Sequence, residues 1–138
     1  MKLLIINGPN LNLLGKRETS VYGDIAFGDY LRKIRKQFPD LEIDCFQSNV
    51  EGEIINTMHK VDLLYDGVII NAGGYSHTSV SIGDAVKAID TPVVEVHISN
   101  VYSREGYRQK SLIAPGAKGM ILGFGMDSYR LAVQSFLI

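Results

Sequence analysis

Residues 67–79 read GVIINAGGYSHTS, and this stretch decides the fold class. Its first four residues form a short apolar run that contains Val68, Ile69 and Ile70. A continuous run of this kind is typical of a parallel strand that helices cover on both faces. The glycine-rich and polar residues that follow predict a loop at the carboxyl end of that strand.

The same arrangement recurs along the chain. Further apolar runs lie at residues 3–6, 41–46, 92–98 and 120–124. The first and the last of these are, like residues 67–70, almost continuous in apolar residues. We therefore expect these strands to be buried on both faces.

Amphipathic segments separate the apolar runs. Apolar side chains at helical spacing are Ile25, Tyr30, Leu31, Ile34 and Phe38, then Ile54, Ile55, Met58 and Val61, then Ile82, Ala85, Val86 and Ile89, and finally Tyr129, Leu131, Ala132, Val133 and Phe136. Each set predicts a helix with one buried face, and a short helical turn is expected at residues 103–109. The alternation predicts an α/β fold: a five-stranded parallel sheet in the flavodoxin-like order 2-1-3-4-5, with helices on both faces.

Size and composition fit this architecture. The chain has 138 residues, of which 46% are hydrophobic and 21% are charged, and these values suit one domain over residues 1–138. A formal net charge of −1 gives no basic surface for nucleic acid or an acidic membrane. The lone Cys45 cannot form an internal disulfide, and the apolar run after Lys2 is too short for a signal peptide. We therefore expect a cytoplasmic protein without a nucleic-acid or membrane partner.

Polar residues gather where three of the predicted strands end, in the loops at residues 7–10, 71–74 and 95–100. In the expected strand order these three strands are neighbours. Ligands of open α/β sheets bind beyond the carboxyl ends of the strands, at the point where the order reverses. The three loops therefore predict one shared binding site, to which Asn10 and Asn71 can offer side-chain amides.

Residues 15–23, between two glycines, are polar and carry Arg17 and Tyr22. This composition favours a mobile lid over the site. The alternative is an exposed loop with a solvated arginine and a packed tyrosine, and spacing alone does not separate the two.

Two histidines are candidates for proton transfer or binding. His97 lies in an apolar strand, two residues after Glu95, so both side chains face the same side and the glutamate can orient the imidazole. The alternative is a core histidine that a neighbour satisfies. His77 precedes Thr78 and Ser79, whose hydroxyls suit an anion at a helix start but are equally explained by helix capping.

Other functional classes lack their residues. The sequence has no HExxH, no CxxC and no clustered carboxylates, which predicts no catalytic metal, and it has no GxGxxG, GxxxxGK[ST] or GxSxG motif. We therefore expect no cofactor. Two rival hypotheses stay open: a non-enzymatic flavodoxin-like module that binds flavin or accepts a phosphoryl group, and a catalytically silent scaffold. Asn7 and Asn71 occupy the positions where a phospho-receiver needs acidic residues.

Four blocks together resemble type II 3-dehydroquinate dehydratase. They are INGPNLN at residues 6–12, RETSVYG at residues 17–23, NAGGYSHTS at residues 71–79, and EVHISN at residues 95–100 with Arg104, Glu105 and Arg108 after it. The blocks occur in the family's order over nearly the whole chain. The resemblance implies a flavodoxin-like subunit that converts 3-dehydroquinate to 3-dehydroshikimate and water through an enolate, without metal or cofactor, in the shikimate pathway or in quinate breakdown.

The resemblance also implies a role for each matched residue. Tyr22 is the base, Arg17 the lid arginine that activates it, and His97 the general acid beside Glu95. Asn10 holds a water at the enolate oxygen. The substrate carboxylate is held by Asn71 and the backbone of Ile98 and Ser99, and its hydroxyls are reached by His77 and Arg108. Asp84 arrives from a neighbouring subunit of a dodecamer, a tetramer of trimers. Arg104 receives no role and stays open as a surface charge.

Two positions depart from the family's pattern. Gly83 stands before Asp84 where a larger residue is frequent, and Gly106 replaces a frequent glutamate. A glycine inside a helix typically costs about 1 kcal/mol, so we expect Gly83 to loosen its helix.

The implied chemistry is physically feasible. A phenol ionises near pH 10, and ionising it near neutrality requires about 4 kcal/mol of stabilisation. One guanidinium at roughly 4 Å supplies about that amount at an effective dielectric near 20, before desolvation. A closed lid that excludes water is therefore a requirement of the mechanism.

Overall fold

The computed structural model describes residues 1–138. Its five strands are β1 (Lys2–Asn7), β2 (Glu42–Gln47), β3 (Gly67–Asn71), β4 (Val93–His97) and β5 (Gly119–Leu122). All pairs are parallel, and the order is β2-β1-β3-β4-β5. The predicted fold class and strand order are confirmed.

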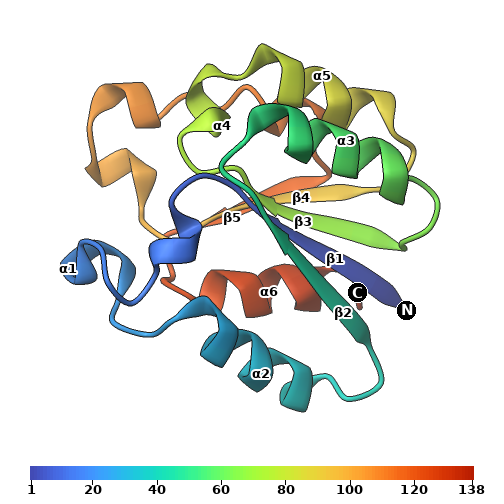
Figure 1. The fold of residues 1–138 in the computed structure, drawn as a ribbon, viewed down its shortest axis with the longest axis horizontal. Coiled ribbons are helices and arrows are strands. Elements are labelled where there is room, and N and C mark those ends of the chain that lie inside the picture. Colours follow the sequence, from blue (N-terminus) through green and yellow to red (C-terminus); the bar gives the residue numbers. More distant parts are fainter.

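Helices cover both faces of the sheet (Figure 1). The α-helices are α1 (Thr19–Tyr22), α2 (Phe27–Gln37), α3 (Glu51–Val61), α4 (Tyr75–Thr78), α5 (Val80–Ala88) and α6 (Asp127–Ser135), and the 3-10 turns are η1 (Leu11–Leu13), η2 (Val101–Ser103), η3 (Gly106–Arg108) and η4 (Ala114–Gly116). Figure 1 shows α2 and α6 on one face and α3 and α5 on the other. Strand β1 sends alternate side chains into two separate cores: Leu3 and Ile5 pack with the α2 and α6 side, and Leu4 and Ile6 with the α3 and α5 side.

The expected helices exist, with shifted boundaries. The first begins at Phe27, and Ile25 lies before it as an exposed residue, so its inclusion in the helical stripe was wrong. Ala26 is in an extended conformation there and so marks the true start. The capping interpretation of Ser79 is confirmed, because its hydroxyl accepts a hydrogen bond of 2.9 Å from the Ile82 N–H at the start of α5.

Strand β5 differs from expectation. All five residues of β3 and of β4 are buried, but Gly119 and Met120 of β5 are exposed. The prediction that this strand is buried on both faces was therefore wrong. β5 is an edge strand with only β4 beside it, and apolar composition alone does not reveal an edge position.

The loops after β1 and β3 touch because residue 8 is glycine. The Gly8 N–H donates to the Asn71 carbonyl at 2.7 Å. A Cβ at Gly8 would lie 2.5 Å from the Ala72 carbonyl oxygen, a distance that no side chain tolerates. This close approach brings the turn that carries Asn10 next to the end of β3.

Gly83 also has a packing reason. It is buried in α5, and a Cβ there would lie 2.4 Å from the carbonyl oxygen of Leu112. The glycine therefore lets the segment around Leu112 lie directly on the helix. The expectation that Gly83 loosens its helix did not include this contact.

We predict that Gly83→Ala lowers the free energy of unfolding by about 1–2 kcal/mol, because overpacking against backbone outweighs the better helix propensity of alanine. Chemical denaturation of both proteins measures this difference. Gly52→Ala in α3 is the matched control, since a Cβ there meets no atom within 4 Å, and it should raise stability slightly. A Gly83→Ala variant as stable as the parent would contradict the packing argument.

Candidate active site

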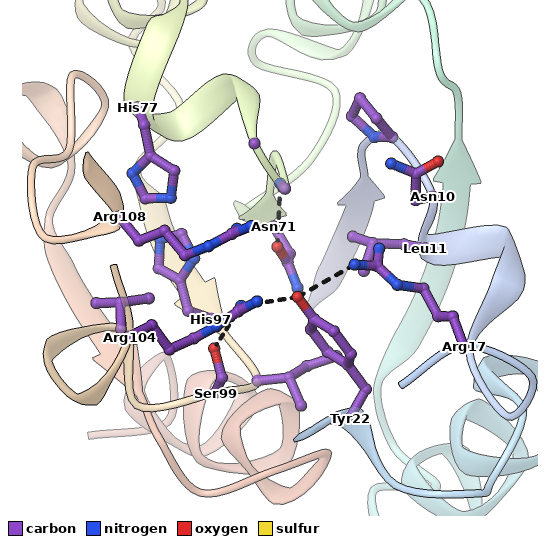
Figure 2. Close-up of a pocket in the computed structure, with 15 residues that line it drawn as sticks. Asn10, Leu11, Arg17, Tyr22, Asn71, His77, His97, Ser99, Arg104 and Arg108 are labelled. Carbon is purple, nitrogen blue, oxygen red and sulfur yellow. Dashed lines mark hydrogen bonds between the residues drawn. The ribbon is translucent and has the colours of Figure 1, made fainter. Parts of the chain in front are cut away.

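A cavity of about 150 Å³ opens at the carboxyl ends of β1, β3 and β4. Figure 2 shows the side chains that surround it. Nine of the eleven residues predicted for the site line this cavity: Asn10, Arg17, Tyr22, Asn71, His77, His97, Ile98, Ser99 and Arg108. The other two, Glu95 and Asp84, lie outside the lining. The three polar loops therefore meet as the strand order predicts.

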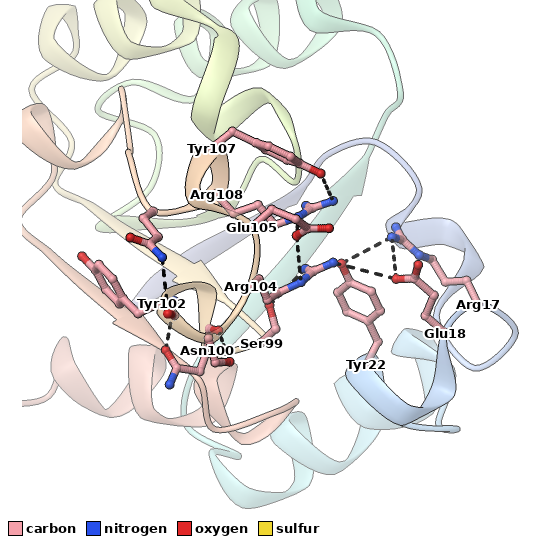
Figure 3. Close-up of polar contacts among 12 residues, drawn as sticks. Arg17, Glu18, Tyr22, Ser99, Asn100, Tyr102, Arg104, Glu105, Tyr107 and Arg108 are labelled. Atoms are coloured by element: carbon pink, nitrogen blue, oxygen red, sulfur yellow. Dashed lines mark hydrogen bonds and ion pairs between the residues drawn. The ribbon is translucent and has the colours of Figure 1, made fainter.

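The Tyr22 hydroxyl lies between two guanidinium groups (Figures 2 and 3). Arg17 donates to it from Nη2 at 3.3 Å, and Arg104 donates from Nη1 at 2.8 Å. The Arg17 and Arg104 guanidinium carbons also lie 4.4 and 5.4 Å from the centre of the Tyr22 ring. Two cations at hydrogen-bond distance stabilise the charged form of a phenol.

A short helix fixes the tyrosine. The segment expected as a lid loop contains the single-turn helix α1. Glu18 precedes this helix, and Tyr22 is its last residue. Glu18 and Gly23, on either side of α1, both have positive φ, at 33° and 82°. The Tyr22 ring is 9% exposed and belongs to the same buried cluster as Leu11 and Leu14. Packing therefore anchors the ring, and its hydroxyl reaches the cavity.

Arg104 is the residue that sequence reasoning missed. Its side chain is 15% exposed and is held by the Ser99 hydroxyl at 3.2 Å and by Glu18 and Glu105, each at 3.9 Å (Figure 3). Its interpretation as a surface charge was wrong. The expected helical turn at residues 103–109 is two 3-10 turns, and Arg104 between them is extended, which directs its side chain to Tyr22.

His97 is held from behind by Glu95. The Nε2 atom of His97 lies 2.5 Å from Oε2 of Glu95, whose side chain is fully buried. Because an ionised carboxylate only accepts, the imidazole carries hydrogen on Nε2 and leaves Nδ1 for a ligand. The two-residue spacing along β4 thus brings the pair together as predicted.

His77 lies against His97 with nearly parallel rings, their centres 5.9 Å apart. Its Nδ1 donates to the Lys110 carbonyl at 2.7 Å, which leaves Nε2 free. Arg108 donates from Nε to Glu105 at 2.8 Å. Burial opposes the charge on Arg108, but that hydrogen bond and the nearby Tyr107 hold its pKa above the ordinary value.

Asn71 is fixed by a buried hydroxyl. Its Oδ1 accepts from the Gly73 N–H at 3.2 Å, and its Nδ2 donates to the Tyr129 hydroxyl at 2.9 Å. Tyr129 is fully buried and donates in turn to Asn7 at 2.8 Å. Burial raises the pKa of Tyr129, so its hydroxyl keeps its proton. One amide hydrogen of Asn71 remains for a ligand. Sequence reasoning counted Tyr129 only as part of an apolar stripe.

The cavity is lined by cations and lacks acidic side chains. Arg17, Arg104 and Arg108 contribute guanidinium groups, and no aspartate or glutamate belongs to the lining. Asp84 is exposed on α5, beside Ile55 and on the α3 side of the molecule, away from this cavity. The site therefore favours an anionic ligand such as a carboxylate.

No group of three or more His, Cys, Asp or Glu side chains is arranged to hold a metal ion. No helix has the length and apolar character that crossing a membrane requires.

Comparisons with known proteins agree with this geometry. The sequence model of the family described as Dehydroquinase class II matches residues 1–137. A 3-dehydroquinate dehydratase of Clostridium perfringens (strain SM101 / Type A) is 50% identical over 139 aligned positions, which cover 98% of this chain and 94% of the relative. A 3-dehydroquinate dehydratase of Caldicellulosiruptor bescii is 50% identical over 97% of this chain and 94% of its own length.

A solved structure has the same fold throughout. The type II dehydroquinase of Butyrivibrio crossotus DSM 2876 superimposes with a TM-score of 0.96 at 39% identity, over 100% of this chain and 98% of that one. These matches favour an enzyme over the non-enzymatic module and confirm the family resemblance. The cationic cavity, the two stacked histidines and the Tyr22 hydroxyl with its two hydrogen bonds agree with this assignment. The chain belongs to the class II dehydroquinase family, the type II 3-dehydroquinate dehydratases.

Proposed function

We propose that Tyr22 is the base and His97 the acid with which this member of the family converts 3-dehydroquinate to 3-dehydroshikimate and water, a step of the shikimate pathway. The observation that carries this assignment is the Tyr22 hydroxyl, which receives hydrogen bonds from two guanidinium groups in the cavity that His97 also lines. A base and an acid around one cavity are what removal of water across a carbon–carbon bond requires.

The proposed base needs stabilisation of its phenolate form, and both arginines donate hydrogen bonds to the Tyr22 hydroxyl. Ionising a phenol three pH units below its ordinary range requires about 4 kcal/mol. Each guanidinium near 4 Å supplies about 4 kcal/mol at an effective dielectric near 20, before the desolvation of the phenolate. Two guanidinium groups therefore stabilise a phenolate more than Arg17 alone would.

The proton balance closes within the site. Tyr22 takes the proton alpha to the ketone, and the electron pair of that C–H bond forms an enolate. Asn10 holds a water that donates to the enolate oxygen. The enolate then re-forms the ketone and a carbon–carbon double bond as the β carbon–oxygen bond breaks. His97, as an imidazolium that keeps its Nε2 hydrogen on Glu95, gives its Nδ1 proton to the departing hydroxide. Return of a proton from Tyr22 to His97 through solvent resets the enzyme.

The remaining residues hold the substrate. Asn71 keeps one amide hydrogen for the carboxylate, and the backbone of Ile98 and Ser99 borders the same part of the cavity. His77 and Arg108 line it as well and suit the ring hydroxyls. The cationic lining adds attraction for the negative charge of the substrate.

We predict that Tyr22→Phe and His97→Asn fold normally and lose turnover by about 10²- to 10⁴-fold, the range of general acid–base catalysis. The conjugated-enone absorbance of the product, followed in the ultraviolet with chelator present, measures turnover. Tyr102→Phe is the matched control, because this tyrosine is 58% exposed and is not in the cavity lining. Ordinary turnover in Tyr22→Phe would remove the proposed base.

A second prediction concerns the two arginines. Arg104→Gln should lower kcat at least as much as Arg17→Gln, by about 10²- to 10³-fold, because its hydrogen bond to Tyr22 is the shorter one. KM should change far less. Steady-state kinetics separate the two constants, and Arg32→Gln, an exposed arginine of α2 paired with Asp29, is the control. An Arg104→Gln variant with unchanged kcat would show that Arg17 is the only arginine that activates Tyr22.

We further propose a dodecamer, a tetramer of trimers, in which Asp84 of one subunit completes the site of its neighbour. The absence of a carboxylate from the cavity lining and the exposed location of Asp84 on α5 support this. In a symmetric oligomer, one surface residue of every subunit meets the same site of the next.

Mixing inactive variants tests this arrangement. Asp84→Ala and Tyr22→Phe subunits are unfolded together and refolded as hybrids. About a quarter of the sites should then combine an intact Tyr22 with an intact Asp84 from the neighbour, so activity should return. Each variant refolded alone serves as the control. Hybrids without activity would show that Asp84 serves its own subunit, and an Asp84→Ala variant that is active when refolded alone would show that Asp84 serves no site.

A cytoplasmic location is also part of this proposal. The protein has one cysteine, Cys45, which is partly buried and cannot form an internal disulfide. Burial raises the pKa of its thiol to about 11, so the thiol stays protonated near neutral pH, and a free cysteine fits a reducing compartment. Cell fractionation would test the location.

A further inference from the structure

Ser111 contacts Glu95, the residue that holds His97. Its hydroxyl donates to Glu95 Oε1 at 2.6 Å and reaches Oε2 at 2.9 Å. Ser111 lies in the segment between η3 and η4 and is not part of the cavity lining. It can therefore influence a bound substrate only through Glu95 and His97.

The direction of the Ser111 hydroxyl hydrogen is fixed. The oxygen accepts from the N–H groups of Ile113 at 3.1 Å and Ala114 at 3.0 Å. A hydroxyl has two lone pairs and one hydrogen, so both lone pairs are occupied and the hydrogen must point to Glu95. A donor that cannot turn away stabilises a carboxylate and disfavours a protonated carboxyl group at the same oxygens.

The segment that carries Ser111 is held on both sides. The Lys110 carbonyl accepts from His77 at 2.7 Å, and the Leu112 N–H donates to the Ser76 carbonyl at 2.8 Å. The side chain of Ile113 is fully buried, and Gly83 lets Leu112 approach α5. The hydroxyl therefore has little freedom to move away from Glu95.

We propose that Ser111 is a positioning residue whose hydrogen bond keeps the Glu95 carboxylate aligned, so that His97 holds its Nε2 hydrogen toward Glu95 and presents Nδ1 to the substrate. The inference rests on the proposed role of His97 as the acid. The chain of contacts is Ser111 to Glu95 to His97, with only the last residue in the cavity. Without the Ser111 hydrogen bond, the buried Glu95 carboxylate could turn, and the imidazole would lose the partner that fixes its orientation.

A double-mutant cycle tests the proposal. Ser111→Ala should lower kcat by about 10- to 100-fold, the rate equivalent of one hydrogen bond to a charged group, with a much smaller change in KM. The same substitution in a Glu95→Gln background should have little further effect, because its action passes through Glu95. Ser111→Thr, which keeps the hydroxyl, should retain most of the turnover.

Controls separate positioning from loop stability. A loss that comes only from a disturbed loop would persist at the same factor in the Glu95→Gln background, and that result would overturn the proposal. Full turnover in Ser111→Ala would overturn it as well. Ser103→Ala removes a neighbouring hydroxyl that donates to the Asn100 carbonyl, and it should leave kcat unchanged. Thermal melting of each variant verifies that it is folded.

The His97→Asn variant distinguishes the two levels of inference. If His97→Asn keeps its turnover, the proposed acid is wrong, whatever Ser111 does. If His97→Asn is inactive and Ser111→Ala is fully active, the acid stands and only the positioning role fails.

Discussion

The parallel pairing of β1 with β3 and of β3 with β4 brings the strand-end residues of the site together. Asn7 lies opposite Asn71, and Ile70 lies opposite Glu95, so the polar residues that end three strands meet at one edge. Buried backbone groups must be paired, and this pairing permits no slip that would keep both cores filled. The cavity is a consequence of that register. Loops then add the groups that a strand end cannot supply.

Charge is distributed unevenly around the cavity. Guanidinium groups and imidazoles face it, whereas the carboxylates that balance them lie behind or beside it: Glu95 under His97, and Glu18 and Glu105 next to the arginines. The lining is therefore cationic, and its positive charges still have carboxylates close by to balance them. A carboxylate substrate meets hydrogen-bond donors that face the cavity. Each donor side chain is also held in place by a partner outside the cavity.

The two halves of the site differ in support. His97, the proposed acid, lies on β4, a fully buried strand, and its partner Glu95 is held from the far side by Ser111. Tyr22, the proposed base, lies on α1, a helix of a single turn between two residues with positive φ. One side of the site is therefore part of the sheet, and the other belongs to a short, separately anchored segment.

The sequence by itself determined the fold class, the strand order and the meeting of three loops, because apolar periodicity and strand order follow from local pattern and chain topology. The spacing of Glu95 and His97 fixed their pairing for the same reason, since alternate residues of a strand share a face. The family blocks supplied the roles that pattern alone left open. The edge position of β5 was not visible, because composition does not report which strand lacks a neighbour.

Tertiary structure decided the contacts that depend on irregular backbone. Arg104 reaches Tyr22 because the chain is extended between two 3-10 turns, and Ser111 reaches Glu95 because Gly83 admits Leu112 against α5. Tyr129 contacts Asn7 and Asn71 from a helix at the far end of the chain. None of these pairs has a regular spacing in sequence. Their partners are selected by the three-dimensional packing of segments, and only the folded chain brings those segments together.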